Sequence, residues 1–213
     1  MAQFEEFNID SARGLLSFNY APDYEDFQDR FSHAETPFII TQKYAGKPYN
    51  LFKIVAESGI VEAQAQLGRM YFVEGESVVQ NYLEALKWLM VSAEQDNSSG
   101  QYYLGVMYDN GIGIDENNEE AAKWYQLSAE QGDSDAQNNL GAMYHFGEGV
   151  PQNFQKAVEW YRMSAEQGDV TGQYNLGWMY DIGEGVDQNK EEAAKWYQLS
   201  AEQNYSDAQN NLG

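Results

Sequence analysis

The sequence of 213 residues contains no cysteine, two histidines and only 12 basic residues against 34 acidic ones. The lack of cysteine excludes disulfides, thiolate metal sites and cysteine nucleophiles. The net charge of −22 argues against nucleic-acid binding, which needs a surface rich in Lys and Arg, and against docking on an anionic membrane. We therefore expect neither nucleic acid nor a membrane among the partners of this protein.

Long apolar runs are also missing. No apolar stretch approaches the roughly 20 residues that cross a bilayer, and Glu5 and Glu6 stand where a secretory signal would carry Lys or Arg. Hydrophobic residues nevertheless make up 43% of the chain and aromatic residues 15%, which is enough for a packed core. The composition predicts a soluble, acidic, cytoplasmic protein.

A period of 36 residues organises most of the chain. The spacing between successive tryptophans of this period is 36, and the first two Leu-Gly pairs are 37 apart because one extra residue lies near Phe72. Self-similarity of this kind indicates a repeat array. The recurring residues are Trp88, Trp124, Trp160 and Trp196, with Leu-Gly pairs at 67–68, 104–105, 140–141, 176–177 and 212–213. We assign the four periodic tryptophans to the core, because large aromatic residues at repeated positions are typically buried.

Each unit is predicted to contain two helices. Ala136, Leu140, Met143 and Tyr144 have the spacing of one helical face, and Asp133 or Ser134 can cap that helix at its start. Gly141 falls inside the helix, where it costs about 1 kcal/mol in propensity. We expect a neighbouring helix to approach closely at this glycine.

The second helix of the same unit begins near Asn153 and ends at Gly168. The glycines at 147 and 149 lie between the two helices and supply the left-handed backbone that a helix end needs. A single helix pair cannot bury its own apolar face, so the units are expected to stack into a solenoid.

The unit pattern resembles a known repeat family. Ala-Gln-x-x-Leu-Gly-x-Met-Tyr, Gly-x-Gly-Val, Ala-x-x-Trp-Tyr and Ala-Glu-Gln-Gly, over about residues 51–213, resemble the Sel-one-like repeat, a relative of the tetratricopeptide repeat. The resemblance implies an all-α, right-handed α/α superhelical solenoid of 36-residue helix-turn-helix units. It implies that first helices line a concave wall and second helices a convex one. It also implies an adaptor or binding scaffold.

Two regions follow from the extent of the period. Residues 1–46 lie outside it and are predicted to form an N-terminal cap, with an independent functional domain as the alternative; a helix after Pro22 and an extended segment around Pro37 are expected there. Residues 47–213 form the array: a degenerate half unit with a second helix at Leu51 to Ala56, four full units and a partial unit. Because the pattern stops at Leu212-Gly213, we expect a fragment, an end covered by a partner, or self-association through the uncapped repeat.

Constellations typical of catalysis or metal binding are missing from the sequence. His33 and His145 are 112 positions apart, and neither a catalytic triad nor a zinc site can be assembled around them. The acidic run 115–120 lacks the glycine that a calcium loop needs at its sixth position. The paired glycines recur with the repeat and are interpreted as turns rather than phosphate loops. We expect no cofactor, no metal and no enzymatic activity.

The candidate binding residues come from the resemblance. In tetratricopeptide-type arrays the second, fifth, ninth, twelfth and thirteenth residues of the first helix face the groove. Among these positions we assign partner binding to Arg69, Tyr102, Asp109, Asn138, His145, Phe146, Tyr174, Trp178 and Asp181. Tyr102, Tyr174 and Trp178 are the aromatic anchors of the type enriched in binding hot spots. The alternative is that these three residues only pack against the next unit.

The predicted partner is another protein. Arg69 is the sole basic residue among the candidate positions, so aromatic and acidic side chains favour a basic or amphipathic partner. Two functions fit: a scaffold in a bacterial assembly or signalling complex, and an immunity-type inhibitor that masks a basic toxin domain.

Overall fold

The computed structural model describes residues 48–73 and 79–212, and this part of the chain is helical without any strand. The chain divides into two compact units after Ser92, and each unit is described by itself. The helix predicted after Pro22 and the extended segment around Pro37 lie outside the described residues.

The first unit contains α4 (Pro48–Glu57), α5 (Val61–Phe72) and α6 (Tyr82–Ala93), the last of which ends one residue past the division. The helix predicted at Leu51 to Ala56 lies within α4. A small core of Val55, Ala56, Ile60, Ala63 and Leu67 joins α4 to α5, and Tyr71 and Trp88 pack against it.

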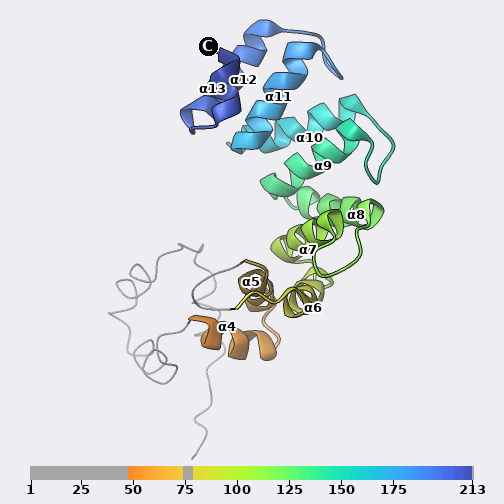
Figure 1. Cartoon of the computed structure of the whole chain (residues 1–213), viewed down its shortest axis with the longest axis vertical. Helices are drawn as coiled ribbons and strands as arrows, with labels where there is room; N and C mark the ends of the chain where they lie inside the picture. Colours follow the sequence, from red (N-terminus) through yellow and green to blue (C-terminus); the bar gives the residue numbers. More distant parts are fainter. Residues whose placement is uncertain (1–47, 74–78, 213) are drawn as a thin grey trace, which may run out of the picture. The chain divides into compact units, whose positions relative to one another are not determined.

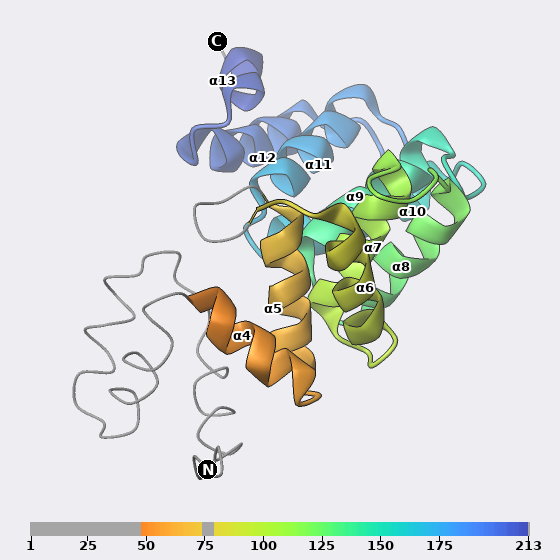
Figure 2. The same ribbon diagram turned by 60° about the horizontal axis from the view of Figure 1, so that its bottom comes forward.

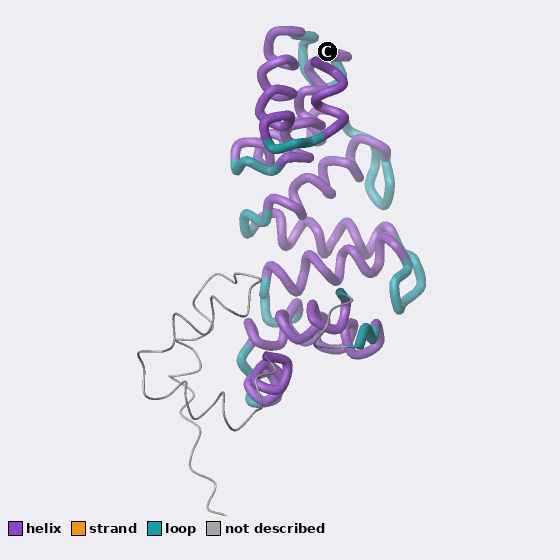
Figure 3. The backbone as a smooth tube through the Cα atoms, turned by 60° about the vertical axis from the view of Figure 1, so that its left-hand side comes forward, coloured by secondary structure: helices purple, strands orange, loops and turns teal. Residues whose placement is uncertain are grey.

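The second unit is an uninterrupted stack of helices. Its elements are α7 (Ser98–Asn110), α8 (Asn118–Glu130), α9 (Ser134–Phe146), α10 (Phe154–Glu166), α11 (Val170–Ile182), α12 (Lys190–Glu202) and α13 (Ser206–Leu212). Each helix packs on the next one along the chain. Figure 1 shows the helices in chain order, and Figure 3 shows the loops that join them. Figure 2 shows α13 beyond the paired α11 and α12. The predicted all-α solenoid of helix pairs is confirmed. We call α7, α9, α11 and α13 first helices, and α8, α10 and α12 second helices.

Local sequence determines where these helices begin and end. The residue before each of α7 to α12 is Asn or Asp, and its side chain accepts a hydrogen bond from the backbone N–H three residues later. Of the two predicted caps of α9, Asp133 is the one that the structure shows, with its Oδ1 2.9 Å from the amide nitrogen of Ala136, and Ser134 is the first residue of the helix. The three long first helices end at Gly111, Gly147 and Gly183, each with a left-handed backbone that glycine adopts without steric cost.

A glycine and a tyrosine interlock at each of the three helix pairs of the second unit. A Cβ built on Gly141 of α9 would lie 2.7 Å from Cδ1 of Tyr161 in α10, and the corresponding distance is 2.6 Å between Gly105 and Tyr125. The close approach expected at Gly141 is therefore confirmed. The same contact recurs between Gly177 and Tyr197, so one steric fit sets how closely each first helix lies against its second helix.

The periodic tryptophans lie less deep than predicted. Trp88, Trp124, Trp160 and Trp196 are only half-buried, whereas the tyrosine that follows in the last three cases is buried, with Tyr125 0% exposed. Trp160 packs against the side of the Tyr125 core, and Trp196 against the core around Tyr161. The assignment of the tryptophans to the core interior is therefore wrong: all four are half-buried, and Trp160 and Trp196 cover core edges between successive units.

Candidate protein-binding face

The candidate positions on α7, α9 and α11 lie at matching places of three successive first helices, and we call this set of residues the first-helix face. It consists of Ser99, Tyr102, Val106, Asp109, Asn110, Asp135, Asn138, Ala142, His145, Phe146, Thr171, Tyr174, Trp178, Asp181 and Ile182. All of them except His145 are half-buried or exposed. Arg69 lies on α5 in the other unit.

His145 is the centre of an aromatic cluster on this face. Its ring centroid lies 4.4 Å from that of Phe146, 5.1 Å from Trp178 and 5.5 Å from Phe154. Its Nε2 is 3.1 Å from Oε2 of Glu184. The structure therefore brings together three of the predicted residues from two successive first helices. Phe154 and Glu184 complete the cluster, although sequence reasoning missed them because they lie outside the five helical positions.

Two apolar side chains of the face are open to solvent. Phe146 is 63% exposed and Ile182 is 39% exposed, and they occupy the thirteenth position of α9 and of α11. Each directly precedes the glycine that ends its helix. These side chains are the apolar groups that a partner could cover without disturbing the core.

Tyr102 and Tyr174 contact other parts of the array. Tyr102 lies 6.1 Å from Tyr125 between ring centroids, and Tyr174 lies 5.6 Å from Tyr197 and 5.1 Å from Tyr205. The packing role considered for them is thus present in the structure. Both keep a partly exposed surface.

A direct contact between first helices connects two units. Nδ2 of Asn175 donates a hydrogen bond to Oδ1 of Asn138 at 2.8 Å, and α9 and α11 pack on each other along this line. This contact is expected where first helices form the inner side of a curved array. It fixes Asn138 within the face.

Carboxylates at one edge of the face repel one another. Burial raises the pKa of Asp135, and the charges of Asp133 and Asp169 raise it further. At the other edge, burial raises the pKa of Asp109, the hydrogen bond from Tyr125 acts in the opposite direction, and Glu148 and Glu116 raise the pKa again. At both places burial is the main cause of the raised pKa, and neighbouring carboxylates add to it.

Basic residues are confined to the other set of helices. Between residues 93 and 212 they are Lys123, Lys156, Arg162, Lys190 and Lys195, all on second helices. Two of them form ion pairs within their own helix, Lys123 with Glu120 and Lys195 with Glu192. Lys190 instead forms an ion pair with a first helix, since its Nζ lies 2.6 Å from Oδ1 of Asp181 on the first-helix face.

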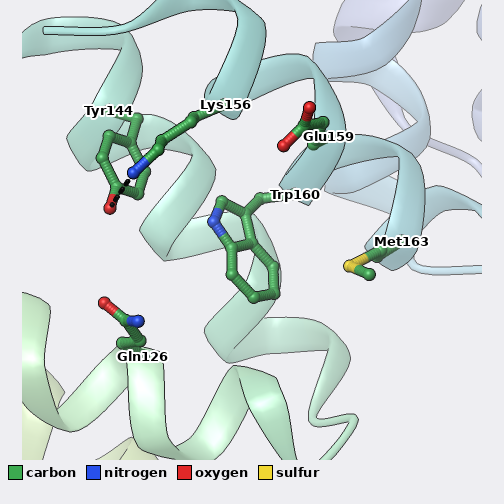
Figure 4. A pocket seen from close by; sticks show the side chains of 6 residues that line it. All are labelled: Gln126, Tyr144, Lys156, Glu159, Trp160 and Met163. Atoms are coloured by element: carbon green, nitrogen blue, oxygen red, sulfur yellow. Dashed lines mark hydrogen bonds between the residues drawn. The ribbon is translucent and has the colours of Figure 1, made fainter.

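Two small pockets accompany these helices. One, of about 180 Å³, is lined by Gln126, Tyr144, Lys156, Glu159, Trp160 and Met163. Figure 4 shows Trp160 between Gln126, Tyr144 and Met163, with the Lys156 amine 3.4 Å from the Tyr144 hydroxyl. The other, of about 240 Å³, is lined by Asp181, Lys190, Ala193, Ala194, Tyr197 and Asn211.

Neither a metal site nor a membrane helix is found in the described residues. No group of three His, Asp or Glu side chains there could hold a metal ion. No helix in this part of the chain is long and apolar enough to cross a bilayer.

Comparison with known proteins gives the same repeat. The Sel1 repeat matches residues 61–97, 98–133, 134–169 and 170–205. The chain is 30% identical over 79 residues to the DAP3-binding cell death enhancer 1 of Mus musculus, a match that takes in 37% of this chain and 15% of that protein. It therefore spans a small part of the curated relative.

Solved structures share the architecture. The protective antigen c5321 of uropathogenic Escherichia coli, which displays an SLR fold, is 38% identical with a TM-score of 0.72 over 77% of this chain and 35% of its own. A Sel1 repeat protein from Oxalobacter formigenes is 34% identical with a TM-score of 0.71, and the match covers 77% of this chain and 65% of that protein. The immunity protein Pa5087 from Pseudomonas aeruginosa shares the fold, with 20% identity and a TM-score of 0.54. The match covers 90% of this chain and 70% of that protein. The four matched repeats and their stacked helix pairs show that the chain belongs to the Sel1 repeat family.

Proposed function

We propose that this protein is a non-enzymatic interaction scaffold whose first-helix face binds a basic or amphipathic segment of another protein. The observation that carries the proposal is the confinement of the basic side chains to one set of helices. The first helices of residues 93–212 carry carboxylates and no Lys or Arg, while all basic side chains of that part lie on second helices, together with eight acidic residues. A cationic partner therefore meets no like charge on the first helices and charges of both signs on the second helices.

The apolar groups of the same face supply the contact area. Phe146 is 63% exposed and its ring is held against His145, so little side-chain freedom is lost when a partner covers it. Trp178 packs edge-on against the same imidazole. Rigid aromatic side chains of this kind are enriched among binding hot spots.

The arrangement around His145 supports binding rather than catalysis. Phe146, Phe154 and Trp178 enclose the ring, and Glu184 engages its Nε2. A general base must reach the proton that it takes from a substrate. This histidine, which is 7% exposed, instead holds two first helices together.

The test uses purified protein as bait in an extract of its native host. The wild type should retain a basic or amphipathic protein, identified by mass spectrometry, and Phe146→Ala should weaken its binding at least about tenfold, or about 1.4 kcal/mol, in a calorimetric titration. Met163→Ala is the matched control, because Met163 is a 50% exposed apolar residue on a second helix. Equal losses for both variants would overturn the proposal.

An immunity-type inhibitor is the narrower form of the same function. The acidic first-helix face supports it, because charge attraction speeds the capture of a basic domain. The titration distinguishes the two forms: an inhibitor abolishes the toxic activity of its purified partner at equimolar ratio, whereas a scaffold leaves the partner's activity intact.

A further inference from the structure

Three pairs of side chains occupy the same place in successive helix pairs. Each pair joins the twelfth residue of a first helix to the first residue of the second helix that follows it. The pairs are Asp109 with Asn118, His145 with Phe154, and Asp181 with Lys190. The chain separation is nine residues in every case.

In two of these pairs the two side chains contact each other directly. The rings of His145 and Phe154 lie 5.5 Å apart between centroids, and Nζ of Lys190 lies 2.6 Å from Oδ1 of Asp181. A long side chain at the first position of a second helix therefore reaches the twelfth residue of the preceding first helix. In both pairs the two side chains are chemically complementary: the Phe154 ring packs against the His145 imidazole, and the Lys190 ammonium pairs with the Asp181 carboxylate.

The remaining pair lacks its matching group. The carboxylate of Asp109 accepts a hydrogen bond from the Tyr125 hydroxyl at 3.2 Å, and within the described residues no Lys or Arg forms an ion pair with it. Asn118, where Lys190 stands in the later unit, is a short neutral side chain. Glu116 and Glu148 add further negative charge at this place, so the site attracts a cation that the chain does not provide.

We propose that the Asp109 carboxylate is a subsite for a Lys or Arg side chain of the bound partner, and that Asp181 is the equivalent subsite occupied by the chain's own Lys190. The inference rests on the proposed function of the first-helix face. It assigns the partner a cationic side chain that lies against α7 and the start of α8. The distance between Lys190 and Asp181 shows the geometry that such a group adopts.

Exchanging the first residues of α8 and α12 tests the subsite, because the exchange places a lysine beside Asp109 or removes the lysine beside Asp181. Asn118→Lys turns the α8 sequence NEEAAKWYQLSAE into that of α12, KEEAAKWYQLSAE, so the variant is compatible with the repeat fold. Lys190→Asn makes the reverse exchange and frees Asp181. Two controls carry the same charge changes at exposed positions of second helices: Gln126→Lys for the first variant and Lys195→Gln for the second.

The probe is a fluorescent peptide of alternating Arg and Leu residues, and the neutral version contains citrulline in place of Arg. Fluorescence anisotropy measures their affinities for the full chain, with circular dichroism to verify folding. We expect Asn118→Lys to weaken binding of the arginine peptide several-fold more than Gln126→Lys does. Lys190→Asn should strengthen it more than Lys195→Gln does, and the citrulline peptide should not respond.

The outcomes separate the two claims. If the arginine peptide binds more tightly than the citrulline peptide but each variant merely equals its charge control, the subsite is wrong and the acidic face stands. If the wild type shows no preference for the arginine peptide, the proposed function fails and the subsite fails with it.

Discussion

Two aromatic residues that are adjacent in sequence have different roles in each second helix. In α10, Tyr161 is 3% exposed and its ring contacts Gly141 of α9. Trp160 turns toward α8 and lines the pocket with Gln126 and Met163. The tyrosine therefore stabilises the helix pair from inside, while the tryptophan covers the joint between units.

This difference in depth predicts the size of two destabilisations. Tyr161→Ala should lower the free energy of unfolding by about 3–5 kcal/mol, the usual range for a buried large aromatic. Trp160→Ala should cost less, because part of that indole is already in water. Urea denaturation followed by circular dichroism measures both; a larger loss for Trp160→Ala would show that the tryptophan carries the core.

The sequence predicted the identity of the repeated residues but not their depth. A period shows that a position is constrained, and the constraint is equally compatible with the interior and with a joint between units. Trp124 and Tyr125 recur together, so periodicity alone could not rank them. The glycine at 105 is the sequence feature that could have identified the buried ring. The space left by its missing Cβ admits one aromatic ring, and the Tyr125 ring occupies it.

Helix boundaries are the elements that the sequence predicted best. The cap of α9 at Asp133, the start of α10 near Asn153 and the end of α9 at Gly147 depend on residues within one turn, so local chemistry is sufficient to place them. The cluster of His145, Phe154 and Glu184 depends instead on distances between three segments. No pattern within one helix contains that information.

The carboxylates at the start of α9 make the stability of the fold depend on pH. Burial raises the pKa of Asp135, and Asp133 and Asp169 raise it further, even though a helix N-terminus favours negative charge. A carboxyl with a raised pKa binds its proton more tightly in the folded state. The free energy of unfolding therefore falls as pH rises from about 4, the ordinary pKa of Asp, through the raised value.

Asp135→Asn should remove this decrease in the free energy of unfolding, because the asparagine stays neutral at every pH. The variant should melt at a higher temperature than the wild type at pH 7, and the difference should vanish near pH 3, where both residues are neutral. Glu191→Gln is the control, because Glu191 is likewise the second residue of its helix; it should bring no such gain. A lower melting temperature for Asp135→Asn at pH 7 would show that the helix dipole outweighs the repulsion.

At the scale of the whole molecule, the net charge of −22 predicts a salt-dependent encounter with a basic partner. The association rate of the arginine peptide should fall as ionic strength passes about 0.1 M, where the Debye length is about 10 Å. Stopped-flow anisotropy at increasing salt measures the rate. A rate that stays constant from low to high salt would assign the acidic residues to solubility alone.

All five basic side chains of residues 93–212 lie on the second helices, which also carry eight acidic residues, whereas the four first helices carry four carboxylates and no Lys or Arg. A cationic partner that approaches the first helices therefore meets no like charge, while one that approaches the second helices meets charges of both signs. Encounters with the first helices are thus opposed by no cation on those helices, and more of them last long enough for the partner to reorient. This lessens the orientational restriction that ordinarily slows protein association.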